Sequence, residues 1–190
     1  MRRTLFVVVV AVSAAAAAAA QQAPAPAAQP TPALDAQQLC AREFGAQFKL
    51  DPKFPPLTAD LDADGQEDLV LVATAKNPLS GELDYHYRAI DPYDAYFGFG
   101  DPKVTVQFSA TNAGASRYLL VVHNWRAPKA KFVILNLPFD SLSVGRVAMR
   151  IKGKKTTVNS IHAVELGGFG ADVYWNGKKY KWEPGNTENE

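Results

Sequence analysis

From residue 49 onward the chain is a series of short runs rich in Val, Ile, Leu, Tyr and Phe, and Gly, Pro, Asn or Asp breaks each run. Such runs between turn-forming residues are typical of β-strands. Ahead of them, Asp35 is a good N-terminal cap, and Cys40, Phe44 and Phe48 recur at four-residue spacing, which predicts a helix over 36–48. We therefore expect a mainly β fold, a small antiparallel domain with one short N-terminal helix.

Eight strands are expected from this pattern, at 57–61, 68–75, 104–110, 117–124, 131–137, 144–151, 156–166 and 173–182. Within the last run, Asn176 and Gly177 can supply the two positive φ angles of a type I′ turn, which predicts a hairpin. Aromatic residues on its arms are expected to hold the hairpin to its sheet, and a carbohydrate-stacking surface is the alternative. They are Tyr174, Trp175, Tyr180 and Trp182.

The first twenty residues have the layout of a secretory signal peptide. Arg2 and Arg3 precede an apolar run over 5–12, and small residues then lead to Ala20. The apolar run is shorter than the roughly 20 residues that a membrane-spanning helix needs. We expect a periplasmic or secreted protein with no membrane span after signal removal, and a retained anchor is the alternative.

The rest of the chain divides by composition. Residues 21–34 are rich in Pro and Ala and carry no charged or aromatic side chain, so they are expected to form a solvated linker. Residues 35–184 have a length that normally makes one domain. A disordered tail is expected over 185–190.

Net charge argues against a nucleic-acid partner. The chain has 20 Lys and Arg against 19 Asp and Glu, and two of the arginines belong to the expected signal peptide. A protein that grips phosphate backbones needs a clear excess of basic side chains. The charges are uneven along the chain, because acidic residues concentrate over 51–101 and basic residues over 146–183.

Cys40 is the only cysteine, so the domain cannot form an internal disulfide. An exported domain without a disulfide must be held by its core, by a metal or by a partner. We expect a buried thiol at Cys40, with an intermolecular disulfide as the alternative.

An acidic stretch lies between the first two expected strands. It reads D-x-D-x-D-G-x-x-D, with aspartate at positions 1, 3, 5 and 9 and Gly65 at position 6. Calcium takes six to eight oxygen ligands at about 2.3–2.6 Å, and a curled loop can point alternate carboxylates and one backbone carbonyl inward. The spacing therefore predicts a calcium site, with a merely soluble acidic turn as the alternative. The expected ligands are Asp60, Asp62, Asp64, the carbonyl of Gln66, and Asp68.

An EF-hand begins in a similar way but continues differently. It takes a bidentate glutamate at position 12 and runs into a helix, whereas position 12 here is Leu71 within the strand-like run DLVLVATA. Both differences exclude an EF-hand and argue against a dockerin-like module.

Residues 57–78 resemble the calcium loop of FG-GAP repeats, the units of integrin α-subunit propellers and of many exported bacterial proteins. In that family D-x-[DN]-x-D-G-x-x-D is followed by an apolar strand, and the resemblance implies the same five ligands. A propeller needs at least four blades, and only one such loop is present in this chain. We expect a single propeller-like calcium hairpin, not a full propeller, with calcium in a structural role.

The segment 84–102 is rich in aromatic residues, Gly, Pro and Asp. It is expected to be an ordered loop packed by its own rings, and a ligand site there is an alternative. Its aromatic side chains and the basic C-terminal region are the parts expected to face a partner.

The chain shows none of the common catalytic motifs, such as G-x-S-x-G or H-E-x-x-H. The expected function is an exported calcium-binding, β-rich binding or scaffold module for an envelope or extracellular protein or glycan. The alternative is a small hydrolase of envelope polymers that uses His123 or a carboxylate pair.

Overall fold

The computed structural model describes residues 35–98, 117–151, 154–165 and 167–185. All of these residues belong to one compact unit of the chain, Leu34–Glu190. The expected signal peptide, the linker and the strand at 104–110 lie outside the described residues, as does the tail from residue 186.

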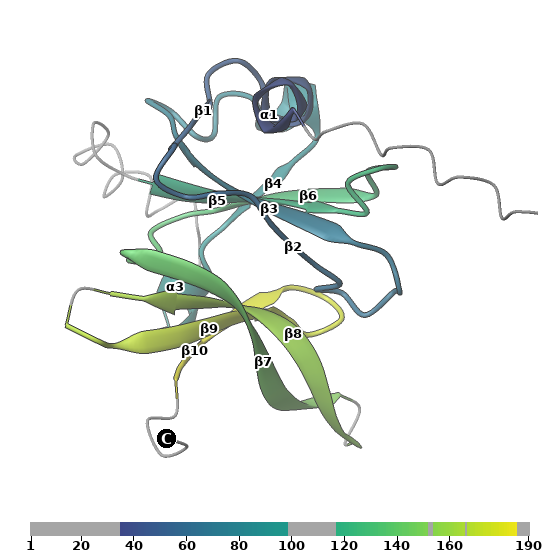
Figure 1. Ribbon diagram of the computed structural model, residues 1–190, viewed down its shortest axis with the longest axis vertical. Helices are drawn as coiled ribbons and strands as arrows, with labels where there is room; N and C mark the ends of the chain where they lie inside the picture. The colour runs from purple at the N-terminus through teal and green to yellow at the C-terminus, as the bar shows by residue number, and fades with distance from the viewer. Residues whose placement is uncertain (1–34, 99–116, 152–153, 166, 186–190) are drawn as a thin grey trace, which may run out of the picture. The chain divides into compact units, whose positions relative to one another are not determined.

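The described residues form a mainly β fold, as predicted, with two sheets and no closed barrel or propeller (Figure 1). The first sheet has the order β1-β3-β5-β6-β4, with β2 also paired to β3, and only the β4–β6 pair is parallel. Its strands are β1 Lys49–Leu50, β2 Leu57–Ala59, β3 Asp68–Thr74, β4 Arg88–Ile90, β5 Arg117–His123 and β6 Ala130–Ile134. The second sheet is antiparallel, in the order β10-β9-β8-β7. Its strands are β7 Ser141–Ile151, β8 Lys154–Val164, β9 Gly170–Trp175 and β10 Tyr180–Pro184.

The first sheet is buried on both faces, which explains why β3 and β5 read as continuous apolar runs. Side chains alternate between the faces of a strand. Leu71 and Leu120 therefore pack toward helix α1 (Ala36–Phe44), whereas Val72 and Val121 pack toward the second sheet. Figure 1 shows α1 on one side of the first sheet and β7–β10 on the other. Apolar burial on both faces of one sheet is the main stabilising element of the domain.

The helix α1 ends at Phe44, so the expected end at residue 48 is wrong. Asp35 caps the start as predicted, because its carboxylate accepts the N–H of Gln38 at 2.9 Å. Gly45 has φ +97°, outside the helical region, and a Cβ there would lie 2.7 Å from the Tyr85 ring. Glycine ends the helix because it alone adopts this backbone angle readily and leaves room for the ring.

Two further helices, α2 (Glu82–Tyr85) and α3 (Pro92–Tyr96), lie in the aromatic segment together with β4. The segment was expected to be an ordered loop packed by its own rings. Its rings do pack on one another, as Phe97 contacts Tyr93 and Tyr96, but the short helices and β4 show that it is not a loop over 84–98. Residues 99–102 lie outside the described residues. Rings of the segment also contact the second sheet, because Tyr93 and Tyr96 pack edge-on against Trp182. None of the helices in the described residues is long and apolar enough to cross a membrane.

The C-terminal hairpin forms where it was predicted, but its turn differs. Trp175 pairs with Tyr180, so four residues connect β9 and β10 instead of two. Only Gly177 has a positive φ there, at +89°, so the predicted type I′ turn is wrong. The Asn176 side chain closes the longer turn by accepting the N–H groups of Lys178 and Lys179, both at 3.0 Å.

Cys40 is fully buried, as predicted, and its Sγ lies 3.9 Å from the carbonyl oxygen of Phe48. Burial raises the pKa of the thiol to about 12, so the reactive thiolate is scarce at neutral pH. We expect a thiol reagent to label Cys40 far more slowly in the native protein than in denaturant. Rapid labelling of the native protein at neutral pH, followed by absorbance or mass, would contradict this packing of α1.

Candidate metal centre

The acidic loop, residues 60–67, connects β2 to β3 in a hairpin whose last pair is Ala59 with Asp68. β2 ends at Ala59, two residues earlier than predicted, because the backbone N–H groups that follow it turn into the loop instead of pairing with β3. The N–H of Leu61, for example, goes to the Asp68 carboxylate. Positive φ angles at Ala63 (60°) and Gly65 (82°) curl the loop, and this curl brings its alternate aspartates together.

The carboxylates of the loop accept hydrogen bonds from the loop's own backbone. Asp60 accepts the N–H groups of Asp64 at 3.1 Å and Gly65 at 3.0 Å through its two oxygens. Asp62 Oδ1 also accepts the N–H of Asp64 at 3.1 Å. These local bonds hold the side chains of positions 1 and 3 against the inside of the turn.

Asp68 is the most deeply placed of the four aspartates, with no exposed surface. Its Oδ2 accepts the N–H of Leu61 at 2.8 Å and of Asp62 at 3.3 Å, and its Oδ1 accepts the N–H of Asn124 at 2.8 Å. Desolvation raises the pKa of this carboxyl, although the N–H donors oppose that effect. Asp68 therefore ties the start of the loop to the end of β5.

Asp60, Asp62 and Asp68 form a cluster in which each side chain offers an oxygen within 4.8 Å of the other two. Two oxygens bound to one calcium ion at about 2.3–2.6 Å lie no more than about 5 Å apart. The charge and spacing of the three carboxylates are therefore compatible with a single hard cation. The partial exposure of Asp60 and Asp62 leaves room for water to complete a coordination shell.

Asp64 is the expected ligand that does not belong to this cluster. Its carboxylate forms an ion pair with Lys129, from the turn after β5. The hydrogen bond from Lys129 lowers the pKa of Asp64, and that bond also raises the pKa of Lys129. Gln66, whose carbonyl is the fifth expected ligand, is exposed, and its N–H donates to Asp64 Oδ1 at 2.8 Å.

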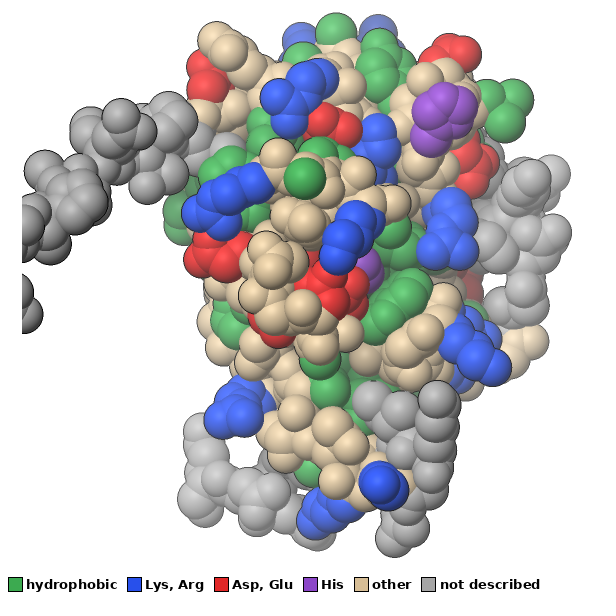
Figure 2. All heavy atoms as spheres, turned by 90° about the vertical axis from the view of Figure 1, so that its right-hand side faces the viewer, with side chains coloured by type: hydrophobic (Ala, Val, Ile, Leu, Met, Phe, Trp, Pro, Cys, Tyr) green, Lys and Arg blue, Asp and Glu red, His purple; other side chains and the backbone are tan. Residues whose placement is uncertain are grey.

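Residues far away in the sequence also hold the loop. Asn159 on β8 donates its side-chain N–H to the carbonyl oxygen of Asp60 at 2.8 Å. The backbone N–H of Trp125 donates to the carbonyl oxygen of Glu67 at 3.3 Å, and Arg126 pairs with the Glu67 carboxylate at 2.6 Å. Figure 2 shows acidic side chains gathered in the middle of one face with Lys or Arg side chains beside them. The loop is therefore joined to both sheets.

His123, the last residue of β5, lies directly behind the loop and is only 3% exposed. Its Nδ1 lies 3.2 Å from Asp62 Oδ2, and its Nε2 lies 2.7 Å from the hydroxyl oxygen of Tyr180. Desolvation raises the pKa of Tyr180, so the phenol keeps its proton. The imidazole is therefore enclosed, and each of its nitrogens contacts another side chain.

A second histidine lies beside a serine and an aspartate on the second sheet, but the group lacks the geometry of a catalytic triad. Ser160 donates to Asp172 Oδ1 at 2.8 Å, and His162 Nδ1 lies 3.3 Å from the same oxygen. Ser160 is fully buried. In a catalytic triad the nucleophile is hydrogen-bonded to the histidine and accessible to substrate. Ser160 meets neither condition, so the cluster is a structural contact between β8 and β9.

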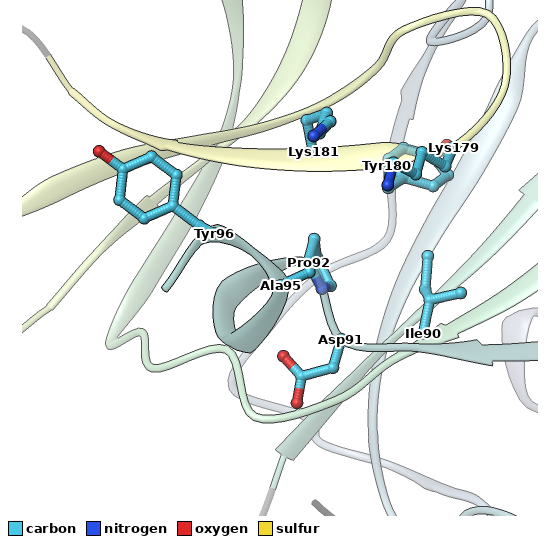
Figure 3. Close-up of a pocket in the computed structure, with 8 residues that line it drawn as sticks. All are labelled: Ile90, Asp91, Pro92, Ala95, Tyr96, Lys179, Tyr180 and Lys181. Carbon is cyan, nitrogen blue, oxygen red and sulfur yellow. The ribbon is translucent and has the colours of Figure 1, made fainter. Parts of the chain in front are cut away.

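A cavity of about 160 Å³ opens between α3 and β10 (Figure 3). Tyr96, Lys179 and Lys181 are among its lining residues, and Tyr180 forms part of its wall. Tyr96 and the neighbouring Phe97 are about half exposed. The aromatic segment and the basic hairpin thus meet at one surface, as far as the described residues show it.

The described residues define a β domain of two sheets with an acidic hairpin loop at the junction of the sheets. No family model matches the chain, and no curated protein or solved structure is significantly similar to it.

The sequence analysis did not identify the residues that are distant from the loop in the sequence but lie beside it in the structure. Lys129, Asn159 and Tyr180 had no local signal that pointed to the loop. His123 was named in the sequence analysis only as a candidate of the alternative hydrolase, and its position beside Asn124 and Trp125 gave no sign of its contacts with the loop and Tyr180.

Proposed function

We propose that this protein is an exported β-rich binding or scaffold module whose acidic loop binds one calcium ion in a structural role. The observation that carries this proposal is the approach of Asp60, Asp62 and Asp68 to within 4.8 Å of one another. All three donors are hard carboxylate oxygens, the kind of ligand that calcium prefers. The spacing of the loop in the sequence supports the same ion.

The structural role follows from what the loop is attached to. The Asp68 carboxylate accepts a hydrogen bond from the N–H of Asn124 at the end of β5, and the Asp60 carbonyl accepts one from the Asn159 side chain on β8. A cation held by the loop neutralises carboxylates that would otherwise repel one another. In this proposal the ion stabilises the junction of the two sheets and takes no part in a reaction.

The export and partner parts of the proposal rest on different features. The signal-like first twenty residues support a periplasmic or secreted location. Tyr96 and Phe97 are exposed beside Trp182, with Lys179 and Lys181 at the adjoining cavity. Exposed aromatic and basic side chains of this kind suit an envelope or extracellular protein or glycan.

Direct calcium binding tests the proposal. Isothermal titration of the metal-stripped protein is expected to show one calcium ion per chain, and magnesium is expected to bind more weakly because it demands tight octahedral geometry. Asp60→Asn with Asp62→Asn removes two carboxylate charges from the cluster and is expected to abolish the calcium heat. Asp84→Asn, an exposed change on α2, is the matched control and should bind like the wild type. A wild-type protein that gives no calcium heat would refute the assignment.

A further inference from the structure

A close contact and a hydrogen bond run in series from the acidic loop into the second sheet. Asp62 Oδ2 contacts His123 Nδ1 at 3.2 Å, and His123 Nε2 contacts the Tyr180 hydroxyl at 2.7 Å. The three residues belong to the loop, to β5 and to β10. His123 and Tyr180 are 3% and 2% exposed, so both rings are shielded from water.

The chemistry of the two groups in the first contact indicates where the proton of the ring lies. An ionised carboxylate offers only lone pairs, so the 3.2 Å contact is favourable when Nδ1 of His123 carries a proton. In a neutral ring Nε2 is then an acceptor, and the Tyr180 hydroxyl donates to it. The Tyr180 hydroxyl thereby favours the tautomer of His123 that carries its proton on Nδ1, the nitrogen that faces Asp62.

Aromatic packing fixes the orientation of the imidazole. The rings of Phe132 and Trp175 each lie with their centroids 5.2 Å from that of His123. A ring enclosed in this way cannot swing toward solvent. Its Nδ1 is therefore held toward a single oxygen of Asp62.

We propose that His123 and Tyr180 are positioning residues that orient the Asp62 carboxylate for cation binding and so raise the calcium affinity of the loop. This inference rests on the proposed function, because it needs the loop to bind a cation. Asp62 is partly exposed, and the contact of its Oδ2 with His123 adds to the hydrogen bond that its Oδ1 accepts from the N–H of Asp64. Partners that orient metal ligands in this way typically change metal affinity by about 10- to 100-fold.

The test measures calcium affinity by competition with a chelating indicator, and separately by terbium luminescence excited through the tryptophans. His123→Leu removes both the Asp62 contact and the Tyr180 hydrogen bond, and it is expected to weaken calcium binding about 10- to 100-fold. Tyr180→Phe removes only the hydroxyl and is expected to weaken it about tenfold, the lower end of that range. His123→Asn places an amide N–H near the position of Nδ1, so it should recover most of the affinity lost in His123→Leu.

Tyr174→Phe is the matched control, because it removes a hydroxyl from the neighbouring strand. That hydroxyl donates to Glu183 at 2.5 Å and not toward the loop. Calcium affinity should be unchanged in this variant. Should His123→Leu fail to fold, which circular dichroism would show, the comparison of Tyr180→Phe with Tyr174→Phe still tests the proposal.

The possible results separate the two proposals. Weaker binding in Tyr180→Phe but not in Tyr174→Phe, with recovery in His123→Asn, supports the positioning role. Equal affinity in the wild type and Tyr180→Phe overturns the positioning role and leaves the calcium site intact. A wild-type protein that binds neither calcium nor terbium overturns the proposed function, and the positioning role with it.

Discussion

Asp68→Ala is expected to destabilise the protein by about 3 kcal/mol or more, because each buried donor left without a partner costs about 1–3 kcal/mol. The substitution removes the acceptor of the buried Leu61 N–H and of the partly buried N–H groups of Asp62 and Asn124. In the wild type these three donors share the two oxygens of one buried carboxylate. For a domain of this size, 1 kcal/mol shifts the melting temperature by about 2–4 °C. A drop of about 6–12 °C is therefore expected.

Denaturant unfolding with excess chelator measures this effect without any contribution from bound metal. Asp68→Asn should have a free energy of unfolding between those of the wild type and Asp68→Ala. Its amide oxygen still accepts a hydrogen bond on one side, whereas its NH₂ group faces a backbone N–H on the other. Asp84→Ala, exposed on α2, should change the free energy of unfolding by less than about 0.5 kcal/mol. An unfolding midpoint for Asp68→Ala equal to that of the wild type would show that these bonds contribute little to stability.

Calcium is expected to stabilise the wild-type protein by about 2.7 kcal/mol when its free concentration is about 100 times the dissociation constant. A ligand that binds the native state and not the unfolded chain stabilises by mass action, and the cluster of Asp60, Asp62 and Asp68 exists only in the folded loop. The melting temperature should therefore rise by about 5–10 °C with calcium and fall again with chelator.

Asp62→Ala combined with Asp64→Ala should abolish the difference between the calcium and chelator melts, whereas Asp84→Ala should keep it. Magnesium should have a smaller effect, because it gives up its water reluctantly and requires tight octahedral geometry. If the calcium and chelator melts of the wild-type protein superimpose, the loop does not bind calcium with useful affinity. In that case the resemblance to calcium-binding repeats would be misleading.

Several features of the fold could be read from local sequence alone. The apolar runs predicted most of the strands, since burial on both faces of the first sheet requires continuous apolar residues in β3 and β5. Asp35 predicted the start of α1 because capping is a local hydrogen bond. The helix end and the turn at 176–179 were missed. The helix end depended on the backbone angle of Gly45 and on the Tyr85 ring beside it. The turn depended on the backbone angles around Gly177 and on the hydrogen bonds of the Asn176 side chain.

The candidate site, like the fold, could be predicted from the sequence only in part. The spacing of the aspartates predicted that Asp60, Asp62 and Asp68 would come together, because a tight loop can point alternate side chains inward. The tertiary structure alone decided that Lys129 pairs with Asp64, that Asn159 holds the loop, and that His123 connects Asp62 to Tyr180. These partners lie on other strands, and strand pairing and sheet packing set their distances. No periodicity within the loop carries that information.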